Sequence, residues 1–162
     1  MTQFIQNVAA ADIPLRFHFD AGENSVLIQI MDPDANWWPT PAHNFKEIHR
    51  FSFEDIDKKH IESNPEDKGK EISDEQAAEI VAILQRALEN KSQVVVHCHA
   101  GICRSGAVAE VGIMMGFSDT ERFRSPNVLV KQKLMKVLGW AYDDSEKEDP
   151  DAWRNYRYDG EY

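Results

Sequence analysis

The chain has 162 residues, of which 42% are hydrophobic and 28% charged, a composition typical of one globular domain with a buried core. Its 18 basic and 28 acidic side chains give a net charge of −10, which argues against nucleic acid or an anionic membrane as the main partner. No apolar run reaches the about 18 residues of a membrane-spanning helix, and two cysteines are too few for a disulfide framework.

The first half of the chain predicts two strands separated by loops. Residues 1–11 lack the basic start and apolar core of a signal peptide, so we expect a cytoplasmic protein. Residues 25–31 and 49–53 have the alternating pattern of strands. The segment 32–41 contains three prolines, and the segment 54–71 is polar, so both are expected to be loops.

The second half predicts three helices around one more strand. A capping box formed by Ser73 and Gln76 begins the first helix. A β-branched run, 94–96, is typical of a central strand that is buried on both faces. The second helix is expected over 104–115, and the third is expected to begin near 125–126 and to end at Gly139.

Strands therefore alternate with helices along the chain. This order predicts a three-layer α/β fold with a central, mainly parallel sheet flanked by helices. We expect a single catalytic domain over 1–142, followed by an acidic, aromatic-containing tail over 143–162.

The residues that carry chemistry follow the buried strand. This strand delivers Cys98 to the carboxyl edge of the sheet, where α/β folds bind ligands. The backbone N–H groups after Cys98 can surround an anion beside the positive end of the next helix, and that field favours the nucleophilic thiolate. Arg104 offers a planar fork for two phosphate oxygens, and Ser105 can donate a hydrogen bond to the sulfur. The predicted phosphate-binding residues are His99, Ala100, Gly101, Ile102, Cys103 and Arg104.

The run His-Cys-His-Ala-Gly-Ile-Cys-Arg-Ser at 97–105 resembles the active-site signature of the cysteine-dependent protein tyrosine phosphatases. The dual-specificity branch is most similar, and the layout over about 25–138 also resembles small bacterial and phage members. The resemblance implies hydrolysis of phosphotyrosine, and also of phosphoserine or phosphothreonine, in a protein or peptide through a phosphocysteine intermediate. It also implies that His97 orients the thiolate and that no metal or organic cofactor takes part.

Such chemistry needs a carboxylic acid that protonates the leaving oxygen. The run Phe-x-Phe-x-Asp at 51–55 resembles the family pattern and nominates Asp55, although Asp55 lies 43 residues before Cys98, which exceeds the usual family spacing. Spacing alone nominates Asp67, and Asp57 is a third candidate. We prefer Asp55, because an acid at the end of a strand is positioned more easily than one inside a long loop.

Cys103 leaves two interpretations open. A thiol at this place can trap an oxidised Cys98 as a reversible disulfide, as in the low-molecular-weight tyrosine phosphatases, or it can be a small residue that only fills the loop. A metal site is not expected, because zinc ligands usually occur as spaced pairs.

Two other functions remain as alternatives. One is a phosphoinositide or RNA 5′-phosphatase of the same fold, which the absence of Lys between Cys98 and Arg104 and the net charge disfavour. The other is a catalytically weak phosphate-binding module. The oligomeric state is not predicted.

Overall fold

The computed structural model describes residues 2–15 and 21–141. The predicted tail over 143–162 lies outside the described residues, and so does residue 142, where the predicted domain ends. Within the described ranges, no helix combines the length and apolar character needed to cross a bilayer.

Five parallel strands form the central sheet, in the order β3-β2-β4-β1-β5. The predicted α/β fold with a parallel sheet is therefore confirmed. The strands span Phe4–Ala9 (β1), Ser25–Met31 (β2), Glu47–Ser52 (β3), Gln93–Cys98 (β4) and Ser118–Asp119 (β5). Because β4 lies between β2 and β1, its last residue, Cys98, reaches the middle of the carboxyl edge.

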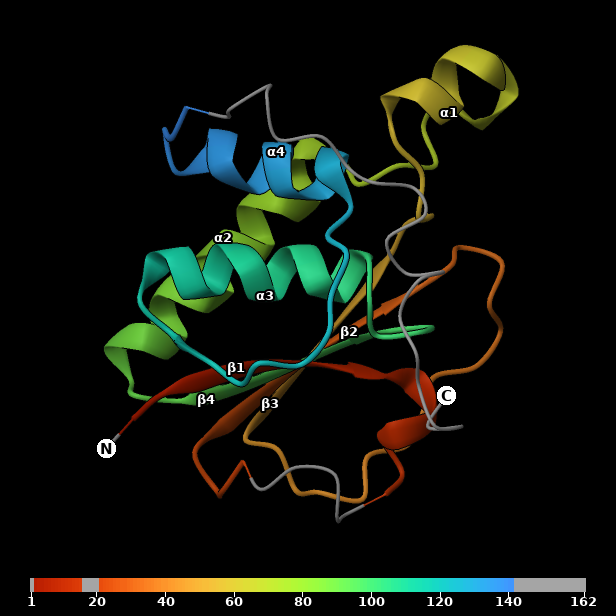
Figure 1. Cartoon of the computed structure of the whole chain (residues 1–162). Helices are drawn as coiled ribbons and strands as arrows, with labels where there is room; N and C mark the ends of the chain where they lie inside the picture. The colour runs from red at the N-terminus through yellow and green to blue at the C-terminus, as the bar shows by residue number, and fades with distance from the viewer. Residues whose placement is uncertain (1, 16–20, 142–162) are drawn as a thin grey trace.

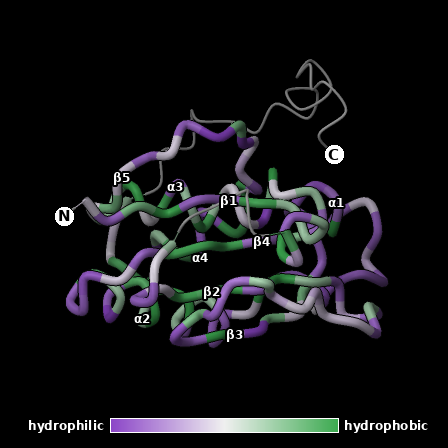
Figure 2. Tube along the Cα trace, turned by 90° about the horizontal axis from the view of Figure 1, so that it is seen from below, coloured by the Kyte–Doolittle hydropathy of each residue, from purple (hydrophilic) through white to green (hydrophobic). Residues whose placement is uncertain are grey.

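The longer helices lie together on one face of the sheet (Figure 1). They are α2 (Asp74–Glu89), α3 (Arg104–Met115) and α4 (Val128–Val137). Loops and the short 3-10 helix Ala10–Asp12 cover the other face, where Leu27 and Val95 pack with Phe45. Figure 2 shows hydrophobic stretches along the strands and helices and hydrophilic ones in the connections.

Local signals explain where the helices begin and end. The predicted capping box is present, since Gln76 N donates to Ser73 Oγ over 3.0 Å and Ser73 N donates to Gln76 Oε1 over 2.9 Å. Gly116, at φ +132°, ends α3 as predicted. The third helix begins later than predicted, at Val128, because Asn127 caps it by accepting from Val130 N over 3.0 Å.

Several elements differ from the sequence prediction. The segment 54–71, expected to be a loop, contains α1 (Lys58–Ser63) and a 3-10 helix (Pro65–Asp67). The side chain of Asp57 caps α1 by accepting from His60 N over 2.8 Å, which stabilises a short helix without a buried face. No strand was predicted for β1, which lies between β4 and β5, or for β5, which forms the edge of the sheet next to β1.

Candidate active site

Cys98 is the last residue of β4 and is only 2% exposed. Its Sγ lies 3.1 Å from the hydroxyl oxygen of Ser105, in the first turn of α3. The sulfur therefore has a hydrogen-bond partner that can donate to a thiolate.

The loop after Cys98 is packed tightly against the end of β1. Gly101 has φ +75°, and a Cβ at this position would lie 2.4 Å from the carbonyl carbon of Val8. Two hydrogen bonds hold the same contact: Asn7 Nδ2 donates to Gly101 O over 2.7 Å, and Ala10 N donates to His99 O over 3.2 Å. Only glycine combines this backbone conformation with so close an approach.

Arg104 begins α3 and is 4% exposed. Its Nη1 donates to Asp32 Oδ1 over 2.7 Å and to the carbonyl oxygen of Phe53 over 2.8 Å. Its Nε is buried and has no hydrogen-bond partner among the described residues. Two acceptors thus fix one end of the guanidinium, while a buried donor is left for an anion.

His97 is fully buried, one residue before Cys98. Its Nδ1 lies 3.3 Å from Cys98 O, which can only accept, so Nδ1 carries the hydrogen in this contact. Burial, with a smaller contribution from the positive charge of Arg104, lowers the pKa of His97 to about 4. The ring is therefore neutral at physiological pH.

Asp55 follows β3 and is exposed at the pocket. Its Oδ1 accepts a hydrogen bond of 2.7 Å from the side-chain amide of Asn127. The same amide nitrogen donates to Ile56 O over 3.1 Å. Asn127, whose Oδ1 also caps α4, thus connects this helix to the segment that carries Asp55.

The two alternative acids lie elsewhere. Asp57 caps α1, as described above. Asp67 accepts from Lys70 Nζ over 2.9 Å and lies 2.7 Å from His60 Nε2, and the hydrogen bonds from His60 and then Lys70 lower its pKa. Neither Asp57 nor Asp67 lines the pocket that contains Cys98.

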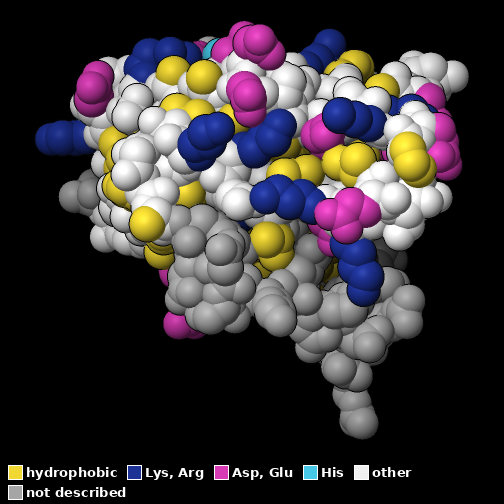
Figure 3. Space-filling model, turned by 90° about the horizontal axis from the view of Figure 1, so that it is seen from above, with side chains coloured by type: hydrophobic (Ala, Val, Ile, Leu, Met, Phe, Trp, Pro, Cys, Tyr) yellow, Lys and Arg dark blue, Asp and Glu magenta, His cyan; other side chains and the backbone are white. Residues whose placement is uncertain are grey.

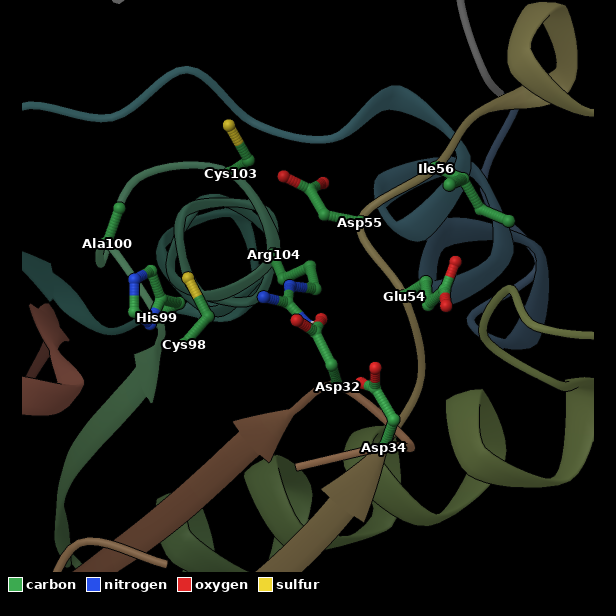
Figure 4. A pocket seen from close by; sticks show the side chains of 10 residues that line it. All are labelled: Asp32, Asp34, Glu54, Asp55, Ile56, Cys98, His99, Ala100, Cys103 and Arg104. Carbon is green, nitrogen blue, oxygen red and sulfur yellow. The ribbon is translucent and has the colours of Figure 1, made fainter. Parts of the chain in front are cut away.

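That pocket has a volume of about 390 Å³ and opens at the carboxyl edge of the sheet (Figure 4). It brings together six of the residues singled out from the sequence: Asp55, Cys98, His99, Ala100, Cys103 and Arg104. Four lining residues were not predicted: Asp32, Asp34, Glu54 and Ile56. The other predicted site residues, His97, Gly101, Ile102 and Ser105, are buried and do not line it.

A sequence signal for Asp32 exists in retrospect. It directly follows the buried strand β2, at the edge where parallel strands place ligand-binding side chains. The prolines and tryptophans that follow Asp32 favoured the prediction of a loop without a functional residue. Asp32, which binds Arg104, was therefore not predicted as a site residue.

Both cysteines are free thiols, Cys98 buried and Cys103 partly exposed. Figure 4 shows the sulfur of Cys103 turned away from that of Cys98. Among the described residues, no group of three or more His, Cys, Asp or Glu side chains is arranged to hold a metal ion.

A family model described as "Polymorphic toxin system, DSP-PTPase phosphatase" matches residues 59–115. The resemblance to dual-specificity phosphatases is thereby confirmed over a segment that runs from α1 through Cys98 and Arg104 to the end of α3. Asp32, Asp55 and Asn127 lie outside the matched segment.

Among solved structures, the chain is similar to OH1 from the Orf virus, described as a tyrosine phosphatase with triple substrate specificity. The identity is 23% and the TM-score 0.45, over 70% of this chain and 57% of that one. The aligned part thus spans little more than half of the viral protein. No curated protein matches the sequence significantly.

Proposed function

We propose that the protein is a cysteine-dependent phosphatase that hydrolyses phosphomonoesters of tyrosine, and also of serine or threonine, in proteins or peptides. The observation that carries the proposal is the shared pocket of Cys98 and Arg104, in which the buried Nε of Arg104 has no partner among the described residues. A phosphate dianion supplies the missing acceptor and places phosphorus beside a sulfur nucleophile.

In the first step, the Cys98 thiolate attacks phosphorus and an S–P bond forms as the ester P–O bond breaks. Asp55 gives its proton to the leaving oxygen, which departs as a neutral phenol or alcohol. Arg104 and the backbone N–H groups of the loop after Cys98 stabilise the charge on the three other oxygens.

In the second step, water attacks the phosphocysteine while the Asp55 carboxylate accepts its proton. The S–P bond breaks, and the sulfur leaves as a thiolate that the Ser105 hydroxyl, 3.1 Å away, stabilises by donating a hydrogen bond. The balance is one ester and one water consumed for one alcohol or phenol and one inorganic phosphate.

The test is hydrolysis of p-nitrophenyl phosphate by the full chain and by Cys98→Ser. We expect the substitution to lower the turnover rate by a factor of at least about 10³. Cys103→Ser makes the same sulfur-to-oxygen exchange in the same loop and is expected to retain a much larger share of the rate. Equal rates for Cys98→Ser and the unchanged chain would overturn the proposal.

The intermediate has its own readout. Mass spectrometry of acid-quenched reactions should show one added phosphoryl group on the peptide that contains Cys98. A panel of phosphotyrosine, phosphoserine and lipid phosphates then distinguishes a protein phosphatase from a phosphoinositide phosphatase. Phosphate binding without turnover of any of them would identify a binding module instead.

A further inference from the structure

The pocket is lined by more acid than a phosphate site needs. Four carboxylates surround it, from Asp32, Asp34, Glu54 and Asp55, whereas Arg104 is the one Lys or Arg among the residues that line it. Figure 4 shows Asp32 against Arg104 and Asp34 beside Asp32, with Glu54 and Asp55 on the segment that follows β3.

Two of these acids already have roles. Asp32 forms the ion pair with Arg104, and Asp55 is hydrogen-bonded to Asn127 and is the proposed acid. Asp34 is exposed and Glu54 is half-buried, and the proposed chemistry uses neither. Lys70 interacts electrostatically with Glu54, but its ammonium group is held 2.9 Å from Asp67.

A second observation indicates what the centre of the pocket can bind. The unpartnered Nε of the buried Arg104 marks a place for an anion, beside Cys98. The centre of the pocket can thus bind an anion, and the four carboxylates lie around it. By contrast, the face that carries α4 mixes both signs of charge (Figure 3).

We infer that the site selects phosphopeptides that carry Lys or Arg next to the phosphorylated residue, an inference that rests on the proposed phosphatase function. The phosphate binds at Arg104, and the neighbouring cation lies against Asp34 and Glu54. A second phosphate or an acidic side chain in that place would meet two carboxylates of like charge, so polyanionic substrates are disfavoured.

The test compares two phosphotyrosine peptides that differ only in having Arg or Glu at the positions flanking the phosphotyrosine. At low ionic strength we expect kcat/KM to be at least about tenfold higher for the Arg peptide. The ratio should shrink in about 0.5 M NaCl, where screening acts over a few ångströms.

A double substitution, Asp34→Asn with Glu54→Gln, should reduce this ratio to about threefold or less. The matched control is Glu23→Gln with Glu89→Gln, which removes the same charge from exposed positions at the opposite, amino edge of the sheet. The control pair should keep the full ratio, which excludes an effect of net charge alone.

The outcomes separate the two proposals. Turnover that depends on Cys98 but is equal for both peptides, or faster for the Glu peptide or for a phosphoinositide in vesicles, overturns the inference and leaves the phosphatase intact. Absence of Cys98-dependent hydrolysis of both peptides and of p-nitrophenyl phosphate overturns the proposed function itself.

Discussion

Asn127 donates a hydrogen bond to Asp55 across 2.7 Å and so connects the start of α4 to the segment that follows β3. Asn127 is 2% exposed, whereas Asp55 is exposed at the pocket. A buried side-chain amide that also caps α4 therefore orients an exposed acid. If Asp55 is the proton donor, Asn127 is a positioning residue for the reaction.

Replacing Asn127 by Ser tests this role. The Ser hydroxyl can still cap α4, but it is too short to reach Asp55. We expect kcat to fall about tenfold with little change in KM, because Asp55 loses its orientation while the loop after Cys98 keeps its shape. Steady-state kinetics measures the split, and Asn127→Ala, which also loses the cap, should have the lower Tm. An unchanged kcat in Asn127→Ser would contradict the prediction.

Asp55→Asn should lower kcat by about 10²–10⁴ for phenyl phosphate, because the leaving oxygen then departs without a proton. The loss should be smaller for p-nitrophenyl phosphate, whose leaving group needs less protonation. Rates for the two substrates give the comparison. Asp57→Asn and Asp67→Asn are the controls, and a larger loss in either would transfer the role of the acid to that residue.

Gly101→Ala should unfold more easily and lose activity. The added Cβ meets the backbone of Val8 at 2.4 Å in a conformation that L residues avoid, which costs about 2–5 kcal/mol. Gly139 has nearly the same φ, +74°, and a Cβ there would have no described atom within 4 Å. Gly139→Ala should therefore cost only about 1 kcal/mol. Urea unfolding measures both, and equal losses would contradict the proposed close contact.

The low pKa of His97 predicts acid sensitivity. Above pH 6.5 the ring is neutral in the folded and the unfolded chain, so it has no effect there. As the pH falls from 6.5 towards 4, the unfolded chain binds a proton that the folded chain does not, and stability decreases by about 3 kcal/mol.

Urea unfolding between about pH 7 and pH 4 measures this loss, and His97→Gln should lose correspondingly less over the same interval. Carboxylates whose pKa is lowered in the folded state, such as Asp119, contribute equally to both proteins and cancel in the difference. Parallel stability curves would show that the His97 ring becomes protonated without cost.

The orientation of Cys103 bears on oxidation. Mild peroxide should convert Cys98 to a sulfenic acid, which condenses with Cys103 if the loop can rearrange to bring the two sulfurs together. We expect a product that has lost two hydrogen atoms and regains them with dithiothreitol. Cys103→Ser should instead proceed to irreversible, higher oxides of Cys98. Identical oxidation products in both proteins would leave Cys103 as a loop residue only.

The strand that carries Cys98 and the ends of two helices were predictable, because their sequence signals are local. A run of three valines predicts a buried strand, Gly116 predicts the end of α3, and Ser73 with Gln76 predicts the start of α2. Each of these patterns reports on its own few residues, so no distant contact is needed to interpret it.

Strand β1 and the acid that holds Arg104 were not predictable in this way. In β1, Gln6 and Asn7 interrupt the apolar pattern, yet both are buried. The side chain of Asn7 is satisfied by Gly101 O, and also by Phe123 O over 3.0 Å, partners that are remote in the sequence. Asp32 likewise acquires its role only because folding brings Arg104 to it.

The packing of Gly101 on Val8 and the hydrogen bond from Ala10 to His99 have a kinetic consequence. The loop after Cys98, which is proposed to bind the phosphate, is held in place by a segment about ninety residues earlier in the chain. Its shape therefore depends on one of the longest-range steps in assembling the sheet. During refolding, recovery of turnover should thus lag behind helix formation and report when the first strand has inserted.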